Sequence, residues 1–162
     1  MTITAGDTLP AATFKTFSSE GIRDVPGAEL FGSGRTVLFA VPGAYTPTCS
    51  ERHMPGFVAN VAQLKAKGVD RIVCVSVNDP FVMNAWGKAT GATEAGVLLV
   101  ADPEAAFTRA LGLEFDGSGA GLGVRSKRYA MVVENGAVSS VAVEDSPGDA
   151  ERSTAEAVLA TL

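Results

Sequence analysis

The sequence has few cysteines, few basic residues and no long hydrophobic run, and each shortage excludes a class of protein. Two cysteines in 162 residues cannot form a disulfide framework, which excludes a small secreted scaffold. The most apolar stretches, 37–41 and 97–101, are far shorter than the ~20 residues of a membrane-spanning helix. The first ten residues lack a basic stretch followed by an apolar run. We therefore expect no secretory signal, no membrane partner and a location in the reducing cytoplasm.

Positive charge is also scarce. The chain has 13 Lys and Arg against 18 Asp and Glu, and its net charge of −5 argues against nucleic acid as a partner. Hydrophobic residues make up 46% of the chain and charged residues 19%, which is ordinary globular composition. A chain of 162 residues has the size of one domain, so we expect a single domain over residues 1–162.

Short runs of β-forming residues predict buried strands, and apolar residues at spacings of three and four predict helices. The expected strands are 36–41, 71–77, 97–100, 128–134 and 137–143. The expected helices are 48–67, 80–88, 102–112 and 149–162, and a glycine-rich loop covers 112–123. Pro55 should bend the first helix, Asp79 should cap the second, and Asn135-Gly136 suits a type I′ hairpin turn. This order predicts an α/β fold with a central mixed β-sheet flanked by helices.

The stretch Pro42–Cys49 lies between a buried strand and a helix, where open α/β sheets place their chemistry. Thr46 fits the N-cap, which puts Cys49 in the first helical turn. The positive end of the helix dipole stabilises a thiolate there, so Cys49 is a candidate nucleophile rather than a buried small hydrophobe. Cys74 lies in an apolar strand, which indicates a buried, inert thiol.

The only histidine, His53, follows Cys49 by four residues and shares its helix face. A hydrolase would need a third group to orient this pair, and a zinc site would need four ligands, of which Cys74 adds only one more sulfur. We therefore expect His53 to order the first helical turn, and we expect no metal site. A basic cluster at 125–128 is either a solvated strand end or the source of a guanidinium that holds the Cys49 thiolate.

The chain resembles the peroxiredoxins, specifically the atypical type II or peroxiredoxin-5-like branch. The matching residues cover nearly the whole chain in collinear order, and the last ~20 residues match least. The blocks that carry the resemblance are Pro42–Cys49, His53–Gly56, Val75–Trp86, Ala101–Pro103 and Arg125–Met131.

The resemblance implies a thioredoxin-like fold and the reduction of hydrogen peroxide and alkyl hydroperoxides. It assigns Cys49 as the peroxidatic cysteine, Thr46 as the hydroxyl that contacts peroxide and thiolate, and Pro42 as the residue that shields the pocket. It assigns Arg125 as the activating cation that binds substrate together with Thr46 and Cys49. We choose Arg125 over Arg128 from its position ahead of the hairpin, and because alternation should point the two to opposite faces. The thiolate becomes a sulfenic acid, and this chemistry requires no metal, haem or flavin.

The resemblance leaves the resolving step open. Some relatives have a resolving cysteine near the C-terminus, but the matching region 147–154 contains none, and others have one where Cys74 stands. We prefer resolution by an external thiol, either glutathione with glutaredoxin or thioredoxin, because the strand around Cys74 would otherwise have to open. The resemblance also implies a homodimer, packed through helix starts near the active site.

Two other functions stay open at this point. One is a redox-sensing interaction protein, in which oxidation of Cys49 changes a partner surface without turnover. The other is a cysteine hydrolase that uses Cys49 and His53. Steady-state consumption of peroxide distinguishes a peroxidase from a redox-sensing protein. An activity that depends on His53, rather than on Arg125 and Thr46, would identify a hydrolase.

Overall fold

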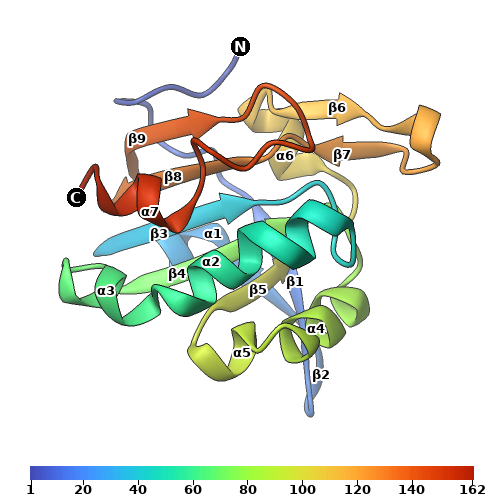
Figure 1. Cartoon of the computed structure of the whole chain (residues 1–162), viewed down its shortest axis with the longest axis horizontal. Coiled ribbons are helices and arrows are strands. Elements are labelled where there is room, and N and C mark those ends of the chain that lie inside the picture. The colour runs from blue at the N-terminus through green and yellow to red at the C-terminus, as the bar shows by residue number, and fades with distance from the viewer.

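The computed structural model describes residues 1–162 as a β-sheet with helices on both faces (Figure 1). Its main strands are β1 (Thr13–Ser18), β2 (Gly21–Pro26), β3 (Arg35–Ala40), β4 (Arg71–Ser76), β5 (Leu98–Ala101), β8 (Tyr129–Glu134) and β9 (Ala137–Val143). Its α-helices are α1 (Gly27–Phe31), α2 (Met54–Ala59), α3 (Val61–Ala66), α4 (Pro80–Ala89), α5 (Ala92–Ala95), α6 (Ala106–Leu111) and α7 (Ala155–Leu159). None of these helices is both long and apolar enough to cross a membrane.

The seven main strands form one sheet in the order β2-β1-β5-β4-β3-β8-β9. The central strands β3, β4 and β5 run parallel to one another. The other pairings, of β1 with β2 and β5, and of β8 with β3 and β9, are antiparallel. This confirms the mixed sheet that the sequence predicts.

The strand β3 is buried on both faces, and its side chains alternate between two hydrophobic clusters. Val37 and Phe39 face a cluster to which α2, α3, α4, α5 and α7 contribute. Leu38 and Ala40 face a second cluster, to which α1 and α6 contribute. A strand covered by helices on both sides reads as a continuous apolar run, which is why 36–41 could be recognised from sequence.

The expected hairpin and the expected cap of α4 are confirmed. Asn135 (φ 50°) and Gly136 (φ 83°) both have the positive φ that a type I′ turn requires, and they join β8 to β9. The Asp79 carboxylate accepts a hydrogen bond from Val82 N–H at 2.9 Å, as an N-cap residue should.

The expected helix 48–67 is divided. A π-helical turn, Cys49–His53, leads into α2, and Asn60 (φ −111°, ψ 12°) separates α2 from α3. Pro55 lies in the first turn of α2, just after the π-helical turn. Proline has no N–H to donate along a helix, and a change in the hydrogen-bond register there accommodates it.

Several elements are absent from the sequence prediction. The strands β1 and β2 cover one edge of the sheet. The glycine-rich region holds a short hairpin of β6 (Glu114–Asp116) with β7 (Val124–Ser126), separated by a 3₁₀ turn, Ser118–Ala120. The last helix begins at Ala155 rather than near 149, because side-chain hydrogen bonds hold residues 151–153 in a loop.

Candidate active site

The loop after β3 closes into a tight turn that sets the start of the next helix. Tyr45 has a left-handed backbone (φ 65°), and both the N–H and the hydroxyl of Thr46 donate to Gly43 O, at 3.3 and 2.7 Å. Ser50 N–H donates to Thr46 O at 3.0 Å, which is the first hydrogen bond of the helix. Thr46 is therefore at the N-cap, and Cys49 lies in the first helical turn, as the sequence predicts.

Cys49 is completely buried and begins the π-helical turn. Turns of this kind are often found at functional sites. The indole N–H of Trp86 donates to Ser50 Oγ at 3.0 Å, which ties this turn to α4. The sulfur is thus held at the amino end of a helix, where the helix dipole stabilises a thiolate.

The Arg128 guanidinium lies against the Cys49 sulfur and is itself only 2% exposed. Its Nη2 donates to Cys49 Sγ at 3.1 Å and to Pro147 O at 2.9 Å. Its Nη1 donates to His53 Nδ1 at 2.9 Å, and its Nε has no hydrogen-bond partner. A guanidinium keeps its charge at any working pH, so this contact places a permanent positive charge against the sulfur.

The structure corrects the expected role of Arg125. That residue does not contact Cys49: its Nη1 donates to Pro42 O at 3.1 Å and its Nε donates to Leu122 O at 3.0 Å. It thereby joins the β6–β7 hairpin to the turn in front of the helix. Arg128, rather than Arg125, is the arginine whose guanidinium contacts the Cys49 sulfur.

The choice of Arg125 rested first on its position ahead of the hairpin, as the family resemblance implied, and second on strand alternation, which was extended across a gap between two strands. β7 ends at Ser126 and β8 begins at Tyr129, so 125 and 128 do not share one pleat. Arg128 instead continues the alternation of β8, on the same face as Ala130. Ala130 packs in the hydrophobic cluster that contains Cys49, so the alternation within β8 alone would have selected Arg128.

His53 is buried beside the rings of Phe39 and Phe57, with centroid distances of 5.1 and 5.5 Å. A guanidinium has no acceptor, so Nδ1 must be the unprotonated nitrogen that accepts from Arg128. Nε2 then carries the proton and donates to Ser153 O at 2.8 Å. Burial, and next the charge of Arg128, lower the pKa of His53 from 6.5 to about 4.

This arrangement leaves the hydrolase hypothesis without support. Both ring nitrogens of His53 are engaged by groups other than Cys49, so neither is free to take a proton from the thiol. As the sequence predicts, His53 and Cys49 lie on one side of the helix, where both contact Arg128.

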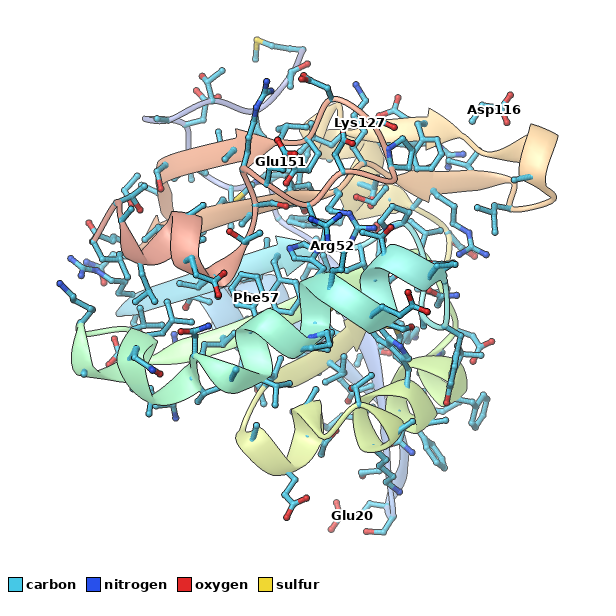
Figure 2. All side chains as sticks on the ribbon, viewed as in Figure 1. Glu20, Arg52, Phe57, Asp116, Lys127 and Glu151 are labelled. Atoms are coloured by element: carbon cyan, nitrogen blue, oxygen red, sulfur yellow. The ribbon has the colours of Figure 1, made fainter.

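A loop of residues 144–154 covers the site and was not identified from sequence as part of it. The loop supplies Pro147 O to Arg128 and Ser153 O to His53. Figure 2 shows Arg52 on the active-site helix facing this loop, where its Nη2 donates to Ala150 O at 3.3 Å. Backbone carbonyls leave no signature in a sequence, which explains why these contacts were missed.

Cys74 lies in the middle of β4, opposite Phe39 in β3 and Leu99 in β5. Its side chain is completely buried, and burial, followed by the proximity of Cys49, raises its pKa well above the usual thiol value. The two sulfurs belong to the same hydrophobic cluster. The sequence expectation of a buried thiol at this position is confirmed.

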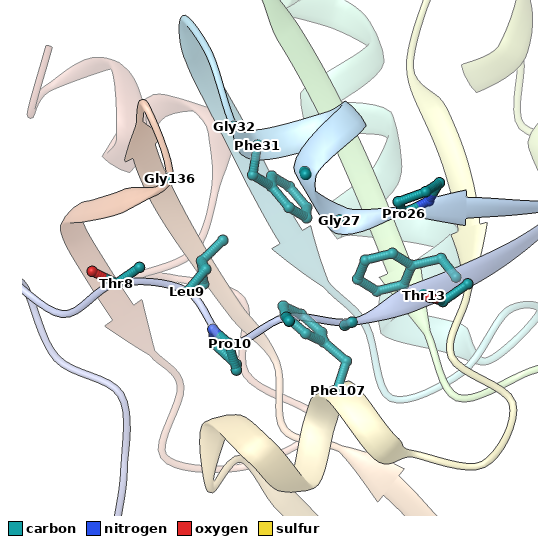
Figure 3. Close-up of a pocket in the computed structure, with 14 residues that line it drawn as sticks. Thr8, Leu9, Pro10, Thr13, Pro26, Gly27, Phe31, Gly32, Phe107 and Gly136 are labelled. Atoms are coloured by element: carbon teal, nitrogen blue, oxygen red, sulfur yellow. The ribbon is translucent and has the colours of Figure 1, made fainter.

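One cavity of the protein lies beside Arg128, and the others lie elsewhere. A cavity of about 130 Å³ is lined by Arg128, Phe115, Lys127 and residues 144–147. A larger cavity of about 590 Å³ lies between the 8–14 segment and α1 (Figure 3), and its lining includes no titratable side chain. The smaller cavity reaches Arg128 from the side of the 144–147 segment, and Cys49, Thr46 and Pro42 are not among its lining residues. The structure brings together no group of three or more His, Cys, Asp or Glu side chains suited to a metal ion.

Comparison with known proteins identifies the family. The Redoxin family model matches residues 4–159. Peroxiredoxin-2E-2 of Oryza sativa is 49% identical over 99% of this chain and 73% of its own length, and Peroxiredoxin-2C of Arabidopsis thaliana is 44% identical over 99% and 98%.

Solved structures agree with these relatives. Reduced Prx3 from Vibrio vulnificus in complex with H2O2 has 53% identity and a TM-score of 0.92, with 98% of each chain covered. Peroxiredoxin 5 from Alvinella pompejana has 33% identity and a TM-score of 0.86, with 98% of this chain and 97% of that chain covered. The chain therefore belongs to the redoxin family as a type II, peroxiredoxin-5-like peroxiredoxin with a thioredoxin-like fold, and it is a thiol-dependent peroxidase.

Proposed function

We propose that Cys49 is the peroxidatic cysteine and that Arg128 is its activating cation. The observation that carries this proposal is the 3.1 Å contact between Arg128 Nη2 and Cys49 Sγ in a buried site. The substrate class is hydrogen peroxide and alkyl hydroperoxides. The H2O2 bound to the related Vibrio vulnificus protein supports this choice.

The proposed reaction is a displacement at oxygen. The Cys49 thiolate attacks the terminal oxygen of the hydroperoxide, an S–O bond forms and the O–O bond breaks. The sulfur is oxidised to a sulfenic acid, and the peroxide is reduced to an alkoxide or hydroxide, which takes a proton to leave as alcohol or water. Arg128 stabilises the negative charge that develops on the leaving oxygen, and its unpartnered Nε–H is an additional donor.

Thr46 and Pro42 complete the proposed site. The Thr46 hydroxyl directs its proton to Gly43 O, which leaves its lone pairs free to accept a hydrogen bond from the peroxide. Pro42 is buried, and its carbonyl is held by Arg125, so its ring keeps a fixed position that shields the sulfur from water. Arg125 acts on the substrate only through this turn.

An external thiol resolves the sulfenic acid in the proposed cycle. Attack by one thiol forms a mixed disulfide with Cys49 and releases water, and a second thiol regenerates the reduced protein. Cys49 becomes accessible by opening the first helical turn, whereas exposing Cys74 requires separating β4 from both β3 and β5. Local opening of one turn costs far less than opening the central sheet. Glutathione with glutaredoxin, or thioredoxin, would supply the electrons.

We also propose a homodimer and a cytoplasmic location. Tyr45 and Phe81 are exposed by 57% and 53%, and both lie at helix starts beside the site, where a second copy could cover them. Light scattering of the reduced protein tests the dimer.

The cytoplasmic location is supported by the two cysteines, which are both free thiols, as is usual in a reducing compartment. Cell fractionation tests the location.

Intact mass after one equivalent of H2O2 tests the proposed cycle, with Cys49→Ser and Cys74→Ser proteins alongside. The expected result is a gain of one oxygen that disappears in Cys49→Ser and persists in Cys74→Ser. A loss of two hydrogens that needs both cysteines would show that Cys74 resolves Cys49. An unchanged mass in the wild type would overturn the role of Cys49. Turnover with glutaredoxin and glutathione, compared with thioredoxin, then identifies the reductant.

A further inference from the structure

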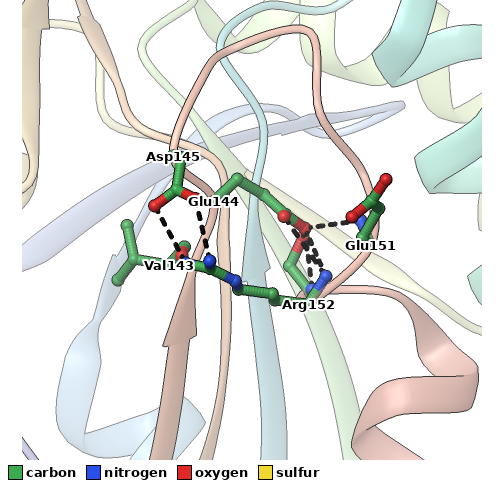
Figure 4. Close-up of polar contacts among 6 residues, drawn as sticks. Val143, Glu144, Asp145, Glu151 and Arg152 are labelled. Carbon is green, nitrogen blue, oxygen red and sulfur yellow. Dashed lines mark hydrogen bonds and ion pairs between the residues drawn. The ribbon is translucent and has the colours of Figure 1, made fainter.

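The carboxylate of Glu144 organises the loop that covers the active site. It accepts hydrogen bonds from the N–H groups of Glu151 (2.9 Å), Arg152 (2.9 Å) and Ser153 (2.8 Å), and from the Ser153 hydroxyl (2.6 Å). Figure 4 shows the Glu144 carboxylate enclosed by this loop, with dashed lines to Glu151 and Arg152. Burial alone would raise the pKa of Glu144, but these hydrogen bonds, those of Ser153 foremost, lower it, so the carboxylate stays ionised.

No side-chain cation accounts for this buried carboxylate. The guanidinium of Arg152 is directed away from Glu144 and pairs with Asp145 at 2.8 Å, near the protein surface. The partners of Glu144 are the backbone of the loop and one hydroxyl. A buried charge with this set of partners fixes the path of the chain rather than forming an ion pair.

The loop fixed by Glu144 in turn fixes His53. The carbonyl of Ser153, the same residue whose N–H and hydroxyl bind Glu144, accepts the Nε2–H of His53. That hydrogen bond places the proton of the neutral imidazole on Nε2 and leaves Nδ1 as an acceptor. Only this tautomer can accept a hydrogen bond from Arg128.

His53 fixes the rotation of the Arg128 guanidinium. Cys49 Sγ and His53 Nδ1 accept from the adjacent Nη2 and Nη1, and Pro147 O accepts a second Nη2 hydrogen bond. Arg128 Nε has no partner. Apart from the sulfur, the acceptors that fix the plane of the guanidinium are therefore His53 Nδ1 and the Pro147 carbonyl of the 144–154 loop. Loss of either would leave Arg128 near Cys49 without a unique orientation.

We propose that Glu144 and His53 are positioning residues for peroxide reduction, linked through Ser153 so that the Arg128 guanidinium is aimed at the Cys49 sulfur. This inference rests on the proposed roles of Cys49 and Arg128. The linkage runs from Glu144 to Ser153, from Ser153 to His53, and from His53 to Arg128.

Two substitutions at His53 separate positioning from stability. In His53→Asn, the amide oxygen lies near the position of Nδ1 and can still accept from Arg128. In His53→Gln, the amide reaches the position of Nε2 and can still donate to Ser153 O, but no acceptor faces Arg128. Both remove the imidazole from the same buried position, so both lower the melting temperature.

The measurements are the single-turnover rate of Cys49 oxidation by H2O2 and the pH at which half of Cys49 is alkylated as a thiolate. We expect the oxidation rate to fall on the order of 10- to 100-fold in His53→Gln, as for other misplaced catalytic groups, and to fall much less in His53→Asn. The midpoint of the alkylation profile should rise in His53→Gln alone. Equal rates and midpoints in the two variants would overturn the positioning role of His53.

Glu144→Gln tests the other end of the linkage, with Asp145→Asn as its matched control. Both remove one negative charge from the same loop, but Asp145 is exposed and does not bind the loop backbone as Glu144 does. We expect a rate loss and a raised alkylation midpoint in Glu144→Gln only. A Glu144→Gln protein that ionises and reacts like wild type overturns the inference while the proposed function stands. If the Cys49→Ser protein were still oxidised by H2O2 as fast as wild type, Cys49 would not be the reacting thiol, and the proposed function would be overturned instead.

Discussion

Arg128 donates to the Cys49 sulfur across 79 positions of sequence. The contact is possible because β8 lies beside β3 in the sheet, and β3 leads directly into the turn before Cys49. A parallel strand–helix unit thus supplies the nucleophile, and an antiparallel neighbour supplies the cation. The mixed topology of the sheet is therefore what assembles the site.

Thr46→Val tests the proposed peroxide contact. Valine keeps the shape of threonine but removes the hydroxyl that donates to Gly43 O and that, in the proposed site, accepts a hydrogen bond from the peroxide. We expect the rate of Cys49 oxidation to fall on the order of 10²-fold, as for loss of one polar group at a reacting oxygen. Thr48→Val is the control, because the Thr48 hydroxyl binds Gly148 O instead, at 3.3 Å. Equal effects of the two substitutions would argue against a contact between Thr46 and peroxide.

Gly43→Ala tests the structural role of Arg125. A Cβ at this position would lie 2.4 Å from Arg125 Nη1, so the guanidinium must leave Pro42 O. The Cβ would also lie 3.1 Å from Thr46 Cγ2, which has to shift by only a few tenths of an ångström. We expect a loss of about 1 kcal/mol in the free energy of unfolding, the usual worth of one hydrogen bond, and a change in oxidation rate of only a few-fold. Urea denaturation and stopped-flow oxidation measure the two effects. A collapse of the oxidation rate without loss of stability would contradict this separation.

Gly87→Ala gives a comparison for that substitution. A Cβ there would lie 2.9 Å from Cγ of Leu99, a half-buried side chain that packs against the core, and 2.6 Å from Oγ1 of Thr93, which is exposed. The branched carbon of Leu99 is held by its packing and cannot move aside as the end of a guanidinium can. We expect about 1–3 kcal/mol of destabilisation, as for other overpacked cores. A smaller loss in the free energy of unfolding than in Gly43→Ala would contradict this explanation of the two substitutions.

Stability should depend on pH through His53. Its folded pKa of about 4 lies below the ordinary value of 6.5, so between these pH values the unfolded chain binds a proton that the folded protein does not. Stability therefore rises with pH across this window, and His53 lowers the free energy of unfolding by about 3 kcal/mol as the pH falls from 6.5 to about 4.

Denaturation of the wild type and of His53→Asn at a series of pH values checks this prediction. The variant lacks the titrating group, so its stability should vary less across the window. Identical slopes in the two proteins would show that other groups cause the acid sensitivity.

The parts of the fold and site that could be predicted from sequence are local in the chain. The β3 strand, the turn and the helix start around Cys49 follow from an apolar run, Thr46 and the helix N-terminal pattern within 36–50. The hairpin at Asn135-Gly136 follows from one dipeptide whose conformation suits a type I′ turn.

The parts that could not be predicted depend on contacts between distant segments. His53 and Ser153 are separated by 100 positions, and the acceptor is a backbone carbonyl that any residue could supply. The choice between Arg125 and Arg128 depended on where β7 ends and β8 begins, a boundary that propensity does not locate to one residue. The sequence predicts a loop where the β6–β7 hairpin lies, because the two strands are only three residues long and glycine flanks them.

The most direct test of the account is the single-turnover rate of Cys49 oxidation by H2O2 in Arg128→Lys and Arg125→Lys proteins. Lysine keeps the charge but cannot donate to Cys49, His53 and Pro147 O from one fixed fork. We predict a rate on the order of 10²–10³-fold lower in Arg128→Lys, and a rate within a few-fold of wild type in Arg125→Lys. A large loss in Arg125→Lys with a near-normal rate in Arg128→Lys would contradict the account.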